Sequence, residues 1–109
     1  RCWNKAVMKK IQSIRYGRRK IKLKFEKLKG LDGYFQTEKN LLVIHNELNG
    51  IDLFNTIIHE FFHIIMFYEN INVNDRGEEP IAIAVGNGYT KIFTQNPKLF
   101  KKITKLIKG

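Results

Sequence analysis

The segment His59-Glu60-Phe61-Phe62-His63 contains the residue types, at the spacing, that a catalytic metal requires. In a helix, residues four apart lie on the same face, so the imidazoles of His59 and His63 stand side by side. Two neutral histidines placed in this way can ligate one zinc ion. Glu60, the next residue, lies about 100° round the helix axis from His59. From there its carboxylate can act as a general base on metal-activated water without ligating the metal.

The surrounding residues predict that this motif lies on a buried helix. Apolar side chains cover nearly every side of the segment from Leu53 to Tyr68, a pattern typical of a helix enclosed in a core. Two imidazoles and a carboxylate buried without partners would each cost about 1–3 kcal/mol. A metal and its water would supply those partners, so a metal site is favoured over an ordinary core helix.

A catalytic zinc usually has three protein ligands, and the third one has several candidates here. No histidine follows His63, which excludes closure of the site by a downstream histidine. Glu79 stands at the expected start of the next element and is the preferred third ligand, with Glu78 as the close alternative. Glu69 stands where metzincins carry their last ligand. However, Met66 replaces the glycine at which that motif turns back toward the metal.

The composition predicts one globular domain over residues 1–109, with 43% hydrophobic and 28% charged residues. The single cysteine, Cys2, excludes an internal disulfide, and the basic N-terminal segment has no apolar signal region. We therefore expect a cytoplasmic protein, and no apolar run is long enough to predict a membrane span. Because the chain begins with Arg1 and not with Met, we also expect it to be part of a longer protein.

Charge is distributed unevenly along the chain, whose net charge is +10. Residues 1–30 hold 12 Lys or Arg and one acidic residue, whereas residues 31–90 hold two Lys or Arg and nine acidic residues. Residues 91–109 hold six Lys and no acidic residue. The basic flanks are suited to weak contact with a nucleic acid backbone, or they form a solvated surface that only aids solubility.

The chain order predicts an α+β fold. A basic helix is expected over residues 3–14, within an N-terminal segment 1–19, and the core is expected to span 20–109. Three short strands with tight turns suggest an antiparallel meander. Their expected positions are 18–29, a strand opening at Tyr34-Phe35, and 41–45. The histidine-bearing helix then runs to about Asn70, and Asn96-Pro97 predicts the start of a final helix.

Residues 81–93 support two interpretations. One interpretation is a β-hairpin. Larger and smaller residues alternate in Ile81-Ala82-Ile83-Ala84-Val85, and a turn is expected at Gly86-Asn87-Gly88. The other interpretation is a helix with Pro80 in its first turn, whose small residues would let it pack closely against the histidine-bearing helix. Local pattern alone leaves both interpretations open.

The chain resembles a minimal zincin metallopeptidase of gluzincin type, over residues 20–107. It is most similar to the small phage and prophage proteins with this motif, and more distantly to the ImmA/IrrE peptidases. The matching segments are Gly33-Tyr34-Phe35, Leu41–His45, Thr56-Ile57-Ile58-His59-Glu60-Phe61-Phe62-His63, Glu78-Glu79, and Asn87-Gly88-Tyr89 to Asn96-Pro97.

This resemblance implies a zincin-like fold, in which a small three-stranded antiparallel sheet packs on the histidine-bearing helix and further helices follow. The segment after Glu79 would be helical, and strand 41–45 would form the sheet edge that binds an extended peptide. The resemblance implies a zinc peptidase acting on a protein or peptide partner, in host cytoplasm or associated with a virion.

The residue roles follow from the same resemblance. His59, His63 and Glu79 would hold Zn²⁺, and Glu60 would be the general base. Tyr89 or Tyr68 would be an oxyanion donor. The alternatives are a catalytically inactive peptidase-like domain and a basic module that associates with nucleic acid.

Overall fold

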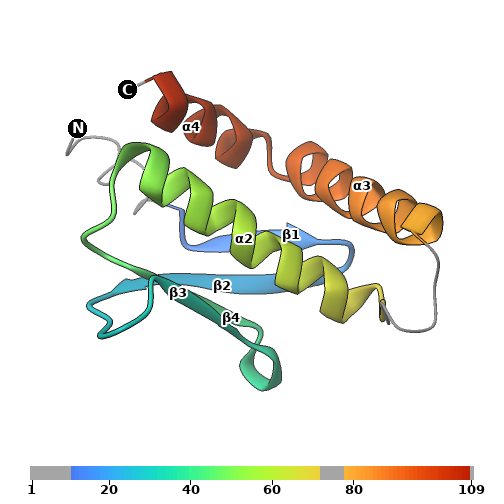
Figure 1. Cartoon of the computed structure of the whole chain (residues 1–109), viewed down its shortest axis with the longest axis horizontal. Helices are drawn as coiled ribbons and strands as arrows, with labels where there is room; N and C mark the ends of the chain where they lie inside the picture. Colours follow the sequence, from blue (N-terminus) through green and yellow to red (C-terminus); the bar gives the residue numbers. More distant parts are fainter. Residues whose placement is uncertain (1–10, 72–77, 109) are drawn as a thin grey trace.

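In the described part of the chain, short strands are followed by three longer helices (Figure 1). The computed structural model describes residues 11–71 and 78–108, and this part of the chain is an α+β fold with a four-stranded mixed sheet. The elements are β1 (Ser13–Tyr16), β2 (Arg19–Glu26), β3 (Gly33–Gln36), the 3-10 turn η1 (Thr37–Lys39), β4 (Leu41–His45), α2 (Gly50–Tyr68), α3 (Glu78–Gln95) and α4 (Pro97–Lys108).

The sheet differs from the predicted antiparallel meander because β4 inserts between β2 and β3. The strand order is β1-β2-β4-β3, with β2 and β4 parallel and the other pairs antiparallel. Strand β4 reads Leu41-Leu42-Val43-Ile44, and the last three of these side chains are fully buried. A continuous apolar run of this kind is suited to a central strand, which has a neighbouring strand on each side. Consequently the sheet edge near α2 is β3, and the prediction that strand 41–45 forms this edge was wrong.

The fourth strand, β1, replaces the end of the predicted N-terminal helix. Most of the helix predicted over 3–14, and with it most of segment 1–19, lies outside the described residues. From Ser13 to Tyr16, however, the chain is a strand whose residues Ile14 and Tyr16 are buried while Arg15 is exposed. Gly17, with φ of +64°, begins the turn into β2. The period of two, stabilised by pairing with β2, therefore prevails over the helical period.

The β1 edge of the sheet is closed by side chains from the junction of α3 and α4. The Arg15 amide donates to Oδ1 of Asn96 at 2.8 Å, and Nδ2 of Asn96 donates to the Arg15 carbonyl at 2.8 Å. The Gly17 amide donates to Oε1 of Gln95, also at 2.8 Å. In the described part of the chain, no hydrogen bond from another element reaches the main chain at the outer edge of β3, which pairs with β4 alone. Within residues 11–71 and 78–108, the sheet therefore has one closed edge and one open edge.

Helix α2 packs its apolar side on one face of the sheet, so the fold is centred on this helix. Leu53, Ile57, Phe61, Ile64 and Ile65 have exposed fractions of 0–2%. They share one core with inward side chains of the strands and with residues of α3 and α4. Burial of each such side chain contributes about 1.5–3 kcal/mol. The core therefore fixes the orientation of α2 and of the side chains on its opposite side.

Residues 78–95 form helix α3, so the β-hairpin interpretation was wrong and the helical one is confirmed. Gly88 is buried where α3 meets α2, and a β-carbon built on it would lie 2.6 Å from Cγ2 of Ile65. Gly88 lets the two helices approach closely, because it has no side chain at this contact. This helix packing prevails over the local turn signal of Gly86-Asn87-Gly88.

Helix α4 begins at Pro97, as predicted, and its apolar stripe closes the core. Leu99, Ile103 and Leu106 have exposed fractions of 1–2%, while Lys98, Lys101 and Lys105 lie on the exposed side. Among the described residues, no helix is long and apolar enough to cross a membrane.

A polar cluster joins the end of α2 to β1 and α3. The Tyr16 hydroxyl donates to Oε2 of Glu69 at 2.6 Å, and the Lys91 ammonium lies 3.3 Å from the same oxygen. The hydrogen bond from Tyr16 is the main reason that the pKa of Glu69 lies below its usual range, and Lys91 lowers it further. Burial, together with the nearby Glu69 carboxylate, raises the pKa of Tyr16, so the phenol stays protonated as a donor.

This cluster predicts a loss of stability in acid. Because the folded-state pKa of Glu69 is depressed, its contribution is present above the ordinary carboxyl pKa and is lost as the pH falls through the folded value. We expect Glu69→Gln to reduce the free energy of unfolding by about 1 kcal/mol at pH 7 and by much less at pH 3. Urea unfolding at the two pH values measures this difference. An equal loss at both values would contradict the assignment.

Candidate metal centre

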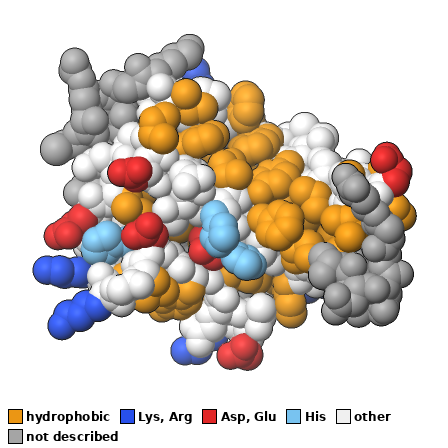
Figure 2. All heavy atoms as spheres, viewed as in Figure 1, with side chains coloured by type: hydrophobic (Ala, Val, Ile, Leu, Met, Phe, Trp, Pro, Cys, Tyr) orange, Lys and Arg blue, Asp and Glu red, His pale blue; other side chains and the backbone are white. Residues whose placement is uncertain are grey.

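The structure brings His59 and His63 together on the surface of α2. Both side chains are exposed, so the expectation that the two imidazoles are buried was wrong. Their Nε2 atoms lie 3.1 Å apart. Figure 2 shows two histidine side chains side by side at the molecular surface, next to a broad apolar area. Since the opposite side of α2 is fixed in the core, the helix itself holds the two rings in this arrangement.

The distance between these nitrogen atoms fits a shared zinc ion. Two nitrogens that each lie about 2.0–2.1 Å from a tetrahedral zinc are about 3.3 Å from each other. The observed 3.1 Å is close to this value, so the separation of the two nitrogens is compatible with one shared metal. Without a metal, the same distance suits a hydrogen bond in which one Nε2 carries a hydrogen and donates it to the other Nε2.

Glu60 lies beside the pair and is the buried member of the motif. Its exposed fraction is 5%, whereas its helix neighbour His59 is exposed. Burial raises the pKa of Glu60, and the imidazoles of His63 and His59 partly offset this effect. A carboxylate with a raised pKa is a stronger base than a solvated one, as a general base requires.

Two hollows meet at the motif, next to the open edge of the sheet. The larger, of about 450 Å³, lies toward the C-terminal end of α2, and the smaller, of about 260 Å³, lies toward its N-terminal end. Gly33, His59 and Glu60 line both of them. The larger is also lined by Tyr34, Phe35, Thr37, His63 and Phe67, and the smaller by Asp32, Asn55 and Thr56. The two hollows form a cleft between β3 and α2.

Gly33 sets the width of this cleft. A β-carbon built on it would lie 3.0 Å from the Val43 carbonyl oxygen and 3.3 Å from Cγ2 of Thr56. Thr56 precedes His59 by one helical turn, so the glycine brings β3 close to the histidine pair. A larger residue at this position would push the strand away from the helix.

The predicted third ligand is not assembled with the histidine pair. Glu79 lies in the first turn of α3 with an exposed side chain, and the side chain of Glu78 lies outside the described residues. Across residues 11–71 and 79–107, no three or more His, Cys, Asp and Glu side chains are grouped to hold a metal. Glu69 is bound to Tyr16 in the cluster described above. Ligation by Glu79 therefore stays a prediction.

The two tyrosines predicted as oxyanion donors point elsewhere. The Tyr89 hydroxyl donates to the Ile58 carbonyl at 2.7 Å, and the Tyr68 hydroxyl donates to Oδ1 of Asn40. Neither tyrosine lines the cleft. The remaining histidine, His45, has a structural role, because its Nδ1 accepts a hydrogen bond from the Leu28 amide at 3.0 Å.

Sequence reasoning missed several residues that line the cleft. Tyr34 and Phe67 have exposed fractions of 36% and 50%, large values for aromatic side chains. Phe67 also packs edge-on against Phe35, with ring centroids 6.1 Å apart. These residues come from β3 and from the turn of α2 after His63. No local pattern marks Tyr34, because the pairing of β3 with β4 brings it to the motif. Phe67 follows His63 by four residues in α2, so helical spacing alone places it next to the motif.

A scan against protein-family models, a search of curated proteins and a search of solved structures each found no match for this chain. The resemblance to gluzincins therefore rests on the sequence motif itself.

Proposed function

We propose that this domain is a zinc-dependent peptidase of minimal gluzincin type. The observation that carries the proposal is the 3.1 Å separation of the His59 and His63 Nε2 atoms. The buried carboxylate of Glu60 lies next to them, in a cleft at the open sheet edge. The buried carboxylate of Glu60 is the unusual feature of this helix, because a buried carboxylate is costly unless it has a partner.

In this proposal each residue of the motif has a distinct task. The Nε2 atoms of His59 and His63 hold the metal, and Glu79 is the predicted third ligand. When bound, zinc polarises the scissile carbonyl and lowers the pKa of water in the site. A carboxylate oxygen of Glu60 takes the proton from the attacking water and passes it to the nitrogen of the leaving amine.

The open edge of β3 is suited to binding a peptide substrate in an extended conformation. Free main-chain amide and carbonyl groups at a sheet edge pair with an added strand, and this mode of binding is largely independent of peptide sequence. A peptide paired with β3 would pass through the cleft beside His59 and His63. Because β1 is closed by Gln95 and Asn96, β3 is the edge suited to this role.

Incubation with a mixed peptide library tests the proposal. The protein is first treated with a chelator, and one half is then reloaded with zinc. We expect new peptide termini, identified by mass spectrometry, in the zinc-loaded sample alone. Cleavage that is equal in both samples would indicate a contaminating or metal-independent activity. No cleavage by fully zinc-loaded protein would favour the inactive peptidase-like alternative.

A further inference from the structure

The sheet face opposite the helices carries a basic surface that the proposed peptidase chemistry does not use. It consists of Arg15 on β1 and of Lys20, Lys22 and Lys24 on β2, all exposed. Residues that alternate with them, such as Ile21 and Leu23, are buried in the core beneath the helices. We call these four cations the basic face.

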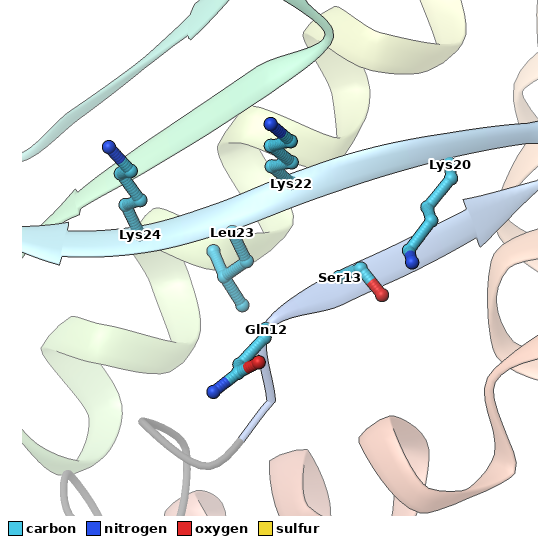
Figure 3. Close-up of a pocket in the computed structure, with 6 residues that line it drawn as sticks. All are labelled: Gln12, Ser13, Lys20, Lys22, Leu23 and Lys24. Atoms are coloured by element: carbon cyan, nitrogen blue, oxygen red, sulfur yellow. The ribbon is translucent and has the colours of Figure 1, made fainter.

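The register of the strands brings the four cations together. Arg15 lies directly opposite Lys20 in the β1–β2 pair, and Lys22 is opposite Ser13. Lys22 and Lys24 project from one side of β2 and Leu23 from the other, while Lys20 extends toward β1 (Figure 3). Like charges directly opposite each other destabilise a strand pair. None of the ion pairs among the described residues involves these side chains, so an external anion would relieve their repulsion.

The basic face is hollowed where β1 and β2 meet. A shallow depression of about 430 Å³ is lined by Gln12, Ser13, Leu23 and the three lysines of β2. Residues two apart in a strand are about 6.6–6.8 Å from each other along its axis. The three lysines are thus attached to β2 at regular backbone intervals and bring several positive charges to the depression, which suits an anion with repeated charges.

The chemistry of this face favours a nucleic acid over a membrane. No large exposed hydrophobic residue of the described chain lies on β1 or β2, so nothing there would insert into a bilayer. The aromatic residues of these strands, Tyr16 and Phe25, are packed with the core and offer no stacking platform to unpaired bases. What remains is contact with phosphates, which is independent of base sequence.

We propose that the basic face binds the phosphate backbone of double-stranded nucleic acid, without sequence specificity and independently of the metal centre. Four phosphate contacts correspond to a slope of about −3.6 in log K against log salt concentration. The affinity would then fall roughly 100-fold between about 50 and 200 mM salt.

Fluorescence anisotropy with a random 20-base-pair DNA duplex tests this proposal. The double variant Lys22→Gln/Lys24→Gln keeps much of the length of both side chains and removes two charges. We expect its salt slope to fall to about −1.8, while Glu60→Gln binds the duplex like the wild type. The matched control is Lys101→Gln/Lys105→Gln, which removes two exposed charges from α4 and should leave the slope unchanged.

Three results would overturn the proposal. One is the absence of duplex binding at 50 mM salt. Another is a control variant whose slope falls as much as that of the Lys22/Lys24 variant, because overall charge would then explain the binding. The third comes from competition experiments with the labelled duplex. If poly-glutamate displaces it at a lower concentration of negative charge than unlabelled duplex does, the face would be assigned to an acidic protein.

Discussion

Replacement of Glu60 by Gln is expected to reduce peptide hydrolysis by about 10²–10⁴-fold while zinc binding is retained. Gln has nearly the same volume as Glu and fills the same buried space, but it cannot accept a proton from water. The two histidine nitrogens that we propose as metal ligands are unchanged, because they belong to the exposed side of α2. Loss of activity with full metal content thus identifies Glu60 as the base.

The same variant should be at least as stable as the wild type when metal is absent. Burial raises the pKa of Glu60, so its ionisation at pH 7 opposes folding, and Gln removes this penalty. Thermal unfolding of the metal-free proteins measures this effect. Glu47→Gln is a matched control, because Glu47 is exposed at 61% and lies outside the cleft. Full activity in Glu60→Gln, or an equal loss in Glu47→Gln, would contradict the assigned role.

The second large effect is expected at the contact between α2 and α3. A β-carbon at position 88 would lie 2.6 and 2.7 Å from Cγ2 and Cγ1 of Ile65, and Ile65 is fully buried. We expect Gly88→Ala to lower the free energy of unfolding by about 1–2 kcal/mol, after the gain in helix propensity is subtracted from the cost of overpacking.

Gly86→Ala is the matched control for this substitution. Gly86 lies in the same helix, is exposed, and has no atom within 4 Å of an added β-carbon. The gain in helix propensity should therefore raise the free energy of unfolding by roughly 0.5–1 kcal/mol. Urea denaturation of both variants gives the two values. A stabilising Gly88→Ala would show that α3 does not pack on α2 at this residue.

The features that local pattern determines could be predicted from the sequence. The apolar run around His59 and His63 predicted a helix, and the spacing of these residues placed both rings on one face. Asn96-Pro97 predicted the start of α4, since proline is suited to the first turn of a helix. In each of these cases the local signal agrees with the tertiary contacts.

The features that depend on contacts distant in sequence could not be predicted in this way. The insertion of β4 between β2 and β3 requires a parallel pair, in which Leu23 lies opposite Leu42, and no turn signal encodes that pairing. Helix α3 packs on α2 where Gly88 lies close to Ile65, a contact between residues 23 positions apart that the local turn signal does not encode. The strand order places β3 at an edge of the sheet, and Asn96, distant in sequence, closes the opposite edge at β1.

The third metal ligand illustrates the same limit. Sequence identified Glu79 by its position at the start of a helix, but ligation depends on how the first turn of α3 lies relative to His59 and His63. If Glu79 binds the metal, Glu79→Gln should weaken zinc binding, whereas Glu69→Gln should not, because Glu69 is held by Tyr16. Competition with a chromogenic zinc chelator measures both affinities.

The most direct test of the proposed metal centre is isothermal titration calorimetry, in which zinc is added to the chelator-treated protein. We expect about one zinc per chain for the wild type and a loss of affinity of more than about 100-fold for His63→Ala. His45→Asn, which changes the remaining histidine far from the pair in sequence, should bind zinc like the wild type. Wild-type protein that binds no zinc, or His63→Ala that binds it equally well, would contradict the assignment of His59 and His63 as metal ligands.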